Sequence, residues 1–395
     1  MAVTDILKNV SLATEQVTVL YPYLREVFIN ETPLITRTPR QSAEGASYSI
    51  ITYNVRQRPH TLNAAINNTG TTLTLTDTTD LMIGDVLELQ NSAGSATERV
   101  YVSAVPTNTT VTITRAAEGT SAVANDTNTN TSLTVTLIGN SRFGSEVDQV
   151  ATRSARVAIP QYTQTFLYPV QIGGLANAVR NTRLPAGISD VFSLEQKTKM
   201  TEMMRDAEYT SYYGKGEAPT SAITGKQKGL KTLIGYWNGT GAMAAGSNVN
   251  VKTSAGGSYT MLNFVADGIQ KALDGGGDPD TVICSTSFMT GLATWGFAKQ
   301  QVIQPRQNEL GTPIKEIEVP FTTGPVTFIP SYQLAAGTAI VLTSKDVTMR
   351  YIRPEFWQPR GIRGDAREGD FIGDLCVEVG HPGWHAWVEG VTGFA

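Results

Sequence analysis

One long helical segment constrains the fold of this chain more than any other feature. Residues 193–214, SLEQKTKMTEMMRDAEYTSYYG, contain no proline and no glycine before Gly214. Ser193 and Gln196 have the spacing of a capping box, and Gly214 suits a left-handed helix stop. At about 1.5 Å per residue, the predicted helix is roughly 30 Å long, enough to cross a domain. The residues on one face at helical spacing are Gln196, Met200, Met203, Met204, Ala207 and Ser211.

The composition is that of a globular chain. Its 395 residues are 41% hydrophobic, which predicts about two or three domains with buried cores. The N-terminus does not resemble a signal peptide and no apolar run approaches the roughly 18 residues of a membrane span, so we expect a soluble product of the cytoplasm. The net charge of −4 gives no basic footprint for nucleic acid, so contact with DNA is expected to be non-specific. Cys284 and Cys376, the only cysteines, lie in apolar strand-like runs and are expected to be buried free thiols.

Two β-rich runs predict an extended ribbon. The runs YSIITYNVR at 48–56 and YTQTFLYPVQI at 162–172 are rich in β-branched and aromatic residues, and we expect them to pair as antiparallel strands. Because a two-stranded ribbon is marginal in water, it must lie on its own chain or on a neighbour. Before it, residues 1–40 predict an arm with one or two short helical turns.

The segment between these runs has a distinct composition. Residues 61–140 contain 20 Thr and no Lys. Regularly spaced apolar residues favour a small all-β insertion, a five-stranded barrel or sandwich, over a disordered linker. The strands expected here cover 72–76, 86–90, 98–105, 110–115 and 132–138.

The rest of the chain predicts an α+β domain. Ser258 or Thr260 can cap a helix that ends at Leu273 before a run of glycines. A second helix is expected at 287–299. Strands are expected at 280–284, 316–321, 326–330, 339–343, 347–352, 374–379 and 384–388.

No set of residues indicates catalysis. His381 and His385 have metal-like spacing, but Pro382 and Gly383 exclude the helix that would bring both rings together, so we expect neither a metal nor a cofactor. The basic, aromatic stretch 353–367 favours a solvated loop that makes subunit salt bridges over a contact with phosphate. A chain of this length without a convergent acid, base, nucleophile or phosphate cradle is more typical of a structural protein.

Short motifs in a fixed order resemble a known family. They are NETPL at 30–34, GDVL at 84–87, ERVYVSAV at 98–105, TRAAEGT at 114–120, IGN at 138–140, YTQ at 162–164, RDAE at 205–208, KGL at 228–230, GDLCVE at 373–378 and HA at 385–386. Together they resemble the major capsid proteins of tailed bacteriophages, whose fold is shared with the capsid floor of herpesviruses.

This resemblance implies a domain plan and a function. It implies an α+β fold with an N-terminal arm at 1–46 and an extended β loop at 47–172 that carries the all-β insertion 61–140. A peripheral domain would comprise 173–229 and 336–395 with a spine helix at 193–214, and an axial domain would comprise 230–335. The chain would form hexamers and pentamers of an icosahedral virion shell around packaged double-stranded DNA.

The resemblance also implies partners. We expect a separate scaffolding protein and a portal, with a decoration protein left open, and no membrane. Because no Lys occurs from residue 9 to 196, an isopeptide bond from the extended loop is excluded and the contacts are expected to be non-covalent. The candidate subunit-contact residues are Arg56, Arg58, Arg205, Tyr209, Tyr212, Tyr213, Arg353, Arg360, Arg363 and Arg367.

Two other function classes remain open from the sequence. A phage tail or adhesion protein would use the Thr-rich segment to bind a receptor or glycan, but it gives the long helix no role. A carbohydrate hydrolase would need paired carboxylates, and no such pair stands out from capping and surface charges.

Overall fold

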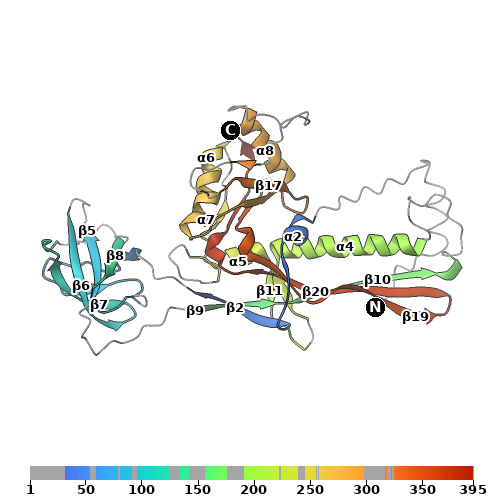
Figure 1. The fold of residues 1–395 in the computed structure, drawn as a ribbon, viewed down its shortest axis with the longest axis horizontal. Helices are drawn as coiled ribbons and strands as arrows, with labels where there is room; N and C mark the ends of the chain where they lie inside the picture. Colours follow the sequence, from blue (N-terminus) through green and yellow to red (C-terminus); the bar gives the residue numbers. More distant parts are fainter. Residues whose placement is uncertain are drawn as a thin grey trace. The chain divides into compact units, whose positions relative to one another are not determined.

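The computed structural model forms two compact units (Figure 1). One comprises residues 1–50, 159–239 and 244–395, and the other comprises residues 51–158 and 240–243. No helix within the described ranges is both long enough and apolar enough to cross a membrane. The structure describes residues 32–53, 59–78, 81–90, 96–123, 134–141, 156–175, 191–221, 224–238, 245–254, 256, 258–297, 316–317, 322 and 324–394.

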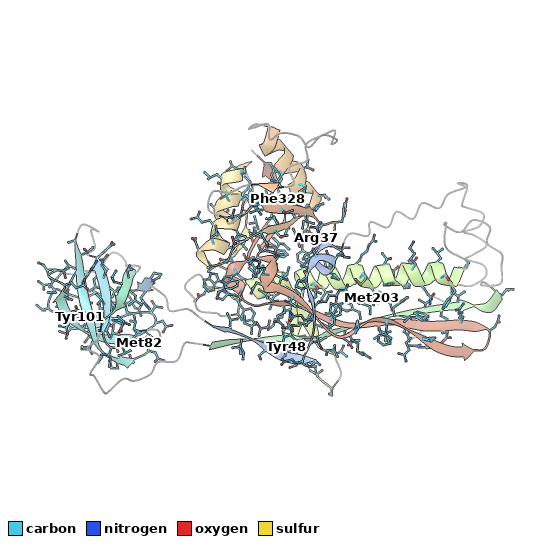
Figure 2. The ribbon with its side chains drawn as sticks, viewed as in Figure 1. Arg37, Tyr48, Met82, Tyr101, Met203 and Phe328 are labelled. Carbon is cyan, nitrogen blue, oxygen red and sulfur yellow. The ribbon has the colours of Figure 1, made fainter. Side chains whose placement is uncertain are left out.

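The first unit is built around helix α4 (Val191–Tyr213), which packs on a four-stranded sheet (Figure 1). The sheet has the order β1-β19-β20-β10, and all neighbours are antiparallel except β1 and β19. Met203 lies between the helix and the strands and is 1% exposed (Figure 2), whereas Met200, expected on the same face, is 45% exposed. The strands are β1 (Arg40–Ser42), β10 (Gln164–Gly173), β19 (Val347–Arg363) and β20 (Ala366–Val379).

The ends of α4 differ from the prediction in a physical detail. The helix begins at Val191, so Ser193 lies in its first turn and does not start it. Gly214 follows the last helical residue, as predicted, but its φ is not positive. A Cβ at this position would lie 2.4 Å from the carbonyl oxygen of Gln227 in β12 (Lys226–Lys228). Gly214 is therefore required for the close approach of β12, not for a left-handed stop.

The predicted ribbon has a different partner. Strand β2 (Ser47–Tyr53) pairs with β9 (Arg156–Tyr162) in a two-stranded sheet, and β10 pairs with β20 instead. The predicted pairing of 48–56 with 162–172 is therefore wrong. At the junction, Thr163 N donates to the Ala46 carbonyl (2.9 Å), and the buried Gln161 amide donates to the carbonyl oxygens of two other segments. These bonds end one strand and direct the next into another sheet.

The predicted loop 353–367 is also corrected. β19 and β20 form a long antiparallel hairpin that extends to Arg363 and Ala366. Register shifts between Tyr351 and Arg353 and between Arg353 and Phe356 accommodate the irregular stretch around Pro354. A proline lacks the N–H that a regular ladder needs, so bulges are the usual way to retain one in a strand.

A six-stranded sheet, in the order β13-β21-β18-β15-β17-β16, carries the second core. Its central strand β18 is buried at all four residues because both faces are covered. Ile283 and Ile340 face the core shared with α4, whereas Val282 and Val341 face a core that includes Phe328 (Figure 2). The strands are β13 (Val251–Thr253), β15 (Thr281–Cys284), β16 (Glu316–Ile317), β17 (Val326–Pro330), β18 (Ala339–Leu342) and β21 (Ala386–Glu389).

The helices of this region confirm most of the predicted order. Thr260 caps the first helix through a bond from Asn263 N to its side-chain oxygen (3.2 Å). That helix runs to Asp274 with a π-helical middle. Both cysteines are buried and free, as predicted. The elements are α5 (Leu230–Ile234), α6 (Met261–Phe264), η1 (Val265–Gln270), α7 (Lys271–Asp274) and α8 (Thr286–Phe297).

Short elements complete the first unit. The arm contributes the five-residue helix α2 (Pro33–Arg37), which fits the expected short helical turn. The others are β11 (Lys215–Glu217), which pairs with β12, β14 (Ser258–Tyr259), which pairs with β22 (Gly393–Phe394), and the turns η2 (Ser344–Asp346) and η3 (Pro382–Trp384).

The second unit contains a small β barrel. Its six strands have the order β3-β8-β5-β6-β7-β4. A bridge between Leu62 and Leu75 joins the two ends of this order, with backbone bonds from Asn63 N to Thr74 O (2.8 Å) and from Thr76 N to Thr61 O (3.0 Å). The five predicted strands are present, and the three-residue β3 is additional. The strands are β3 (Pro59–Thr61), β4 (Thr72–Thr74), β5 (Asp85–Gln90), β6 (Thr97–Thr107), β7 (Thr110–Ala117) and β8 (Thr134–Asn140).

Candidate functional site

Two arginines of the predicted loop, Arg353 and Arg360, are paired with acids of the same hairpin. Arg360 Nε donates to Asp370 Oδ2 (2.6 Å), and Arg353 forms the same kind of pair with Asp374. The Arg side chains are about half exposed, whereas the carboxylates are nearly buried. The stretch expected to be a solvated loop is thus part of a hairpin in which the charges of Arg353 and Arg360 are locally balanced, which leaves less of their charge available to a phosphate backbone.

Between these two ion pairs lies an apolar stripe that is exposed at its two outer residues and buried at its centre, where Ile372 is 8% exposed. Ile372 of β20 is in register with Leu167 of β10 and with Phe356 of β19. Leu167 is 51% exposed and Phe356 is 38% exposed. We call these three residues the hairpin stripe. It was missed in the sequence, although strict alternation along 164–173 would have placed Leu167 opposite the buried Phe166 and Val170.

The tip of the hairpin and the start of α4 line an open cavity of about 320 Å³. Arg367 stacks over the Phe192 ring at 4.2 Å, and Trp357 meets the same ring edge-on at 5.8 Å. This aromatic contact holds Arg367 against its own subunit. The cavity lining includes the acids Asp365 and Glu368 together with Arg360 and Arg367.

The predicted tyrosines of α4 separate into three environments. Tyr209 is 52% exposed, with its ring 4.9 Å from that of Tyr213. Tyr213 packs on Trp387 and its hydroxyl accepts a bond from Ala335 N (2.9 Å). Tyr212 is fully buried within its own chain, which removes it from the set of surface contacts. The sequence analysis had treated all three side chains as candidates for subunit contacts.

The remaining predicted residues are only partly described. Arg205 lies on α4 and is half-buried. Arg56 and Arg58 lie outside the described residues. Arg363 ends β19, and its side chain also lies outside what the structure describes.

A buried carboxylate on α4 was missed. Glu208 is fully buried, accepts a bond from Tyr212 Oη (2.8 Å) and faces the backbone of α2. Burial raises the pKa of Glu208 to about 7, against the opposing effect of its hydrogen bonds. The available signal was an acid within the apolar stripe, directly after the buried Ala207 and four residues before Tyr212.

The barrel is fastened at one end by a buried ion pair. Glu98 is fully buried and accepts bonds from Arg115 Nε (3.0 Å), Ala116 N (2.9 Å) and Val123 N (2.9 Å). Burial alone would raise the pKa of Glu98, but these donors and the charge of Arg115 outweigh it and lower the pKa. On β4 and β7, directly opposed pairs such as Thr72 and Thr112 give the barrel an uncharged, hydroxyl-bearing surface.

The histidines of the 381–385 motif take part in packing. His385 is fully buried and its Nε2 lies 2.9 Å from Asp346 Oδ2. His381 stacks against Trp384, and burial lowers its pKa. Across the described residues, no group of three or more His, Cys, Asp or Glu side chains is placed to hold a metal ion.

A family model described as the SU10 major capsid protein matches residues 20–392. No curated protein matches the chain. The fold is similar to the capsid of a native GTA particle, with 8% identity, coverage of 98% of this chain and 100% of that chain, and a TM-score of 0.49.

Two further solved structures show weaker similarity. A structure of Mycobacterium phage Bobi has 11% identity, covers 98% of this chain and 99% of that chain, and has a TM-score of 0.45. The SrpI encapsulin complex of Synechococcus elongatus has 10% identity, coverage of 99% and 96%, and a TM-score of 0.43. The family match spans nearly the whole sequence, whereas these structural similarities are weak.

Proposed function

Because this chain belongs to the SU10 major capsid protein family, we propose that it assembles as hexamers and pentamers around packaged double-stranded DNA. The family itself establishes a structural, non-enzymatic protein of an icosahedral phage capsid. It also decides between the function classes left open from the sequence, in favour of the shell and against a tail protein or hydrolase. The arrangement into two kinds of ring and the DNA content are our proposal.

The observation that carries the proposal is that apolar side chains are exposed on the two-stranded sheet of β2 and β9 and on the hairpin stripe. The two-stranded sheet of β2 and β9 leaves Ile51 57% exposed. The hairpin stripe leaves Leu167 and Phe356 open on the outer sheet face. A two-stranded sheet is marginal in water, and exposed apolar surface rimmed by polar residues is typical of protein interfaces. Contacts with neighbouring copies would cover both features, and head-to-tail contacts of this kind close into rings.

We further propose roles for the parts. α4 with its four-stranded sheet corresponds to the peripheral domain and its spine helix, and the six-stranded sheet with its helices corresponds to the axial domain. This assignment moves β10, β18 and β21 across the bounds expected from the sequence, because β18 and β21 lie beyond the expected axial range 230–335 and β10 lies almost wholly within the expected loop 47–172. The β2 and β9 strands belong to the extended loop, and the barrel is an insertion within it. The order of these parts along the chain supports this assignment, because the barrel strands lie between β2 and β9.

Electron microscopy tests the assembly. The full chain would be expressed together with its scaffolding protein and imaged in negative stain, and we expect closed shells or flat hexameric sheets. Trimers or fibres would refute the proposal. Portal and scaffolding proteins are proposed as separate partners, and their co-purification with immature particles is the corresponding measurement.

Subunit contacts are proposed to be non-covalent. The chain has no Lys between residues 9 and 196, so the arm beyond Lys8, the ribbon and the barrel cannot provide a lysine for an isopeptide bond. We expect boiled, reduced particles to run as a single monomer band on a denaturing gel. A ladder of multimers would contradict this prediction.

The barrel is proposed to reinforce the shell. The barrel has its own hydrophobic core and closed backbone hydrogen bonding. Deleting residues 61–140 behind a short Gly/Ser linker should leave assembly intact and lower the temperature at which particles disrupt. Unchanged particle stability together with lost adsorption to host cells would favour a receptor-binding role instead.

A further inference from the structure

The arm helix α2 is capped by a side chain from another part of the chain. An α-helix leaves the N–H groups of its first turn without partners. In α2 the first residue, Pro33, has no N–H. Leu34 N donates to Glu208 Oε1 and Ile35 N donates to Glu208 Oε2, both at 3.4 Å. Thr32 provides no side-chain cap. The carboxylate of Glu208 therefore serves both remaining donors.

This contact is sealed from solvent. Glu208 is fully buried, and Leu34 and Ile35 are each 1% exposed within the core that also contains Tyr212. The carboxyl group is covered on one side by α2 itself. When α2 leaves α4, the carboxyl group is exposed to water together with these two apolar side chains.

No positive charge compensates the buried carboxylate among the described residues. From α4, Tyr212 donates to it, and the Tyr213 ring lies 6.4 Å from the Tyr212 ring. From the turn after β17, Ser331 Oγ lies 3.4 Å from Tyr212 Oη and does not titrate near neutrality. From α2, Arg37 lies exposed in the last turn, at the opposite end from the cap. The described partners of the Glu208 carboxyl group are therefore neutral hydrogen-bond donors, namely two backbone N–H groups and the Tyr212 hydroxyl.

We propose that Glu208 is a proton-linked latch that holds the N-terminal arm on α4 when the carboxyl group is protonated and loosens it when the group ionises. Docking buries the carboxyl group, and burial favours its neutral form. The docked group has a pKa of about 7, whereas a solvated Glu has its ordinary value of 4.5. Docking therefore takes up a proton between these values.

The direction follows from that linkage. A raised pKa in the docked state gives a stabilisation that is fully present below pH 4.5 and is lost as the pH rises through about 7. The backbone donors of α2 oppose this trend, because they bind the charged form better, but burial is the larger influence. From pH 5.5 to 7.5 the fraction of time that α2 is detached should rise by up to about 20-fold.

Hydrogen exchange of the arm measures this opening directly. The full chain would be exchanged between pH 5.5 and 7.5, with rates corrected for the intrinsic pH dependence of amide exchange, and the peptide covering 33–40 would be followed. Its reporters include Thr36 N and Thr38 N, which are bonded within α2. Peptides from the barrel serve as an internal check that the chain remains folded.

Two matched variants isolate the carboxyl group. Glu208→Gln is neutral at every pH and retains one carbonyl acceptor for the two N–H donors of α2, so its protection should be independent of pH, whatever its absolute level. Glu202→Gln removes an acid from the same helix, where Glu202 forms a partly exposed pair with Lys199 (2.8 Å), and should keep the wild-type profile.

The exchange experiment has results that support the latch and results that contradict it. Wild-type opening that rises with pH and is abolished in Glu208→Gln supports the latch. A flat wild-type profile, the same profile in Glu208→Gln, or opening that rises as the pH falls overturns it. The inference concerns two elements of one chain, so its failure would leave the proposed assembly untouched.

Discussion

The buried ion pair of the barrel gives the sharpest stability prediction. The change is Arg115→Met, which keeps the aliphatic stem and removes the guanidinium. In the wild type this group serves Glu98, the carbonyl oxygens of Asn67 and Val123 (2.5 Å each) and that of Gly70 (3.2 Å). The Arg115 side chain is 9% exposed and that of Glu98 is wholly buried. The variant therefore leaves a carboxylate in the interior without its counter-charge.

The expected cost is large for a domain of this size. Removing one partner of a buried pair costs about 3–5 kcal/mol, against a total stability of about 5–15 kcal/mol for a typical domain. With a urea dependence of about 1–3 kcal/mol per molar, the midpoint for the barrel should fall by at least about 1 M. The pKa of Glu98 is lowered in the folded state, so the wild-type contribution is present at neutral pH and is lost on acidification through that lowered pKa.

The assay must report on the barrel alone. Urea unfolding of the full chain, followed by hydrogen exchange of peptides from 97–117, meets this need. Arg99→Met is the matched control, because Arg99 pairs with Glu88 and Glu118 on the barrel exterior and its loss should leave the midpoint unchanged.

A double variant tests the cause. Arg115→Met with Glu98→Gln removes both charges and keeps an acceptor for Ala116 N and Val123 N, so it should be more stable than Arg115→Met alone. Equal midpoints for Arg115→Met and Arg99→Met, or a double variant that is additive, would refute the reasoning.

Two further predictions concern close packing and buried thiols. Gly229→Ala should destabilise the chain by about 1–3 kcal/mol in urea unfolding, since its Cβ would lie 2.6 Å from Gly214 N, whereas Gly139→Ala meets nothing within 4 Å and should be neutral. Equal effects would contradict this. Burial raises the pKa of Cys284 to about 12 and also raises that of Cys376, so a thiol reagent at pH 8 should modify neither until the protein is denatured. Rapid labelling of the native chain would show that a thiol is accessible.

Local features were predictable because their causes are local. The long helix was predicted at 193–214 and lies at 191–213, since the absence of Pro and Gly from its interior acts within a few residues. The helix capped by Thr260 and the five strands of 61–140 follow from side-chain spacing in the same way. The family was also predicted from the sequence, from motifs spread along nearly the whole chain, and the family match over residues 20–392 confirmed it.

Strand pairing was less predictable because its partners are distant. The run 48–56 was predicted to pair with 162–172, and β9, the strand that it does pair with, was not recognised. The stretch 353–363 carries Pro354 and Pro359, which are typical of a loop, yet pairing with β20 and local bulges keep it in a strand. Neither the partner nor the bulge is encoded in the periodicity of one segment.

The candidate contact residues show the same division. Spacing placed Tyr209, Tyr212 and Tyr213 near the end of one helix, but packing decided that Tyr209 is exposed and Tyr212 is buried. The sequence by itself determined that an acid follows Ala207 on α4. Only the tertiary structure decided that Glu208 would be buried and would cap a helix 174 residues earlier, because burial and hydrogen-bond partners depend on which distant segments pack together.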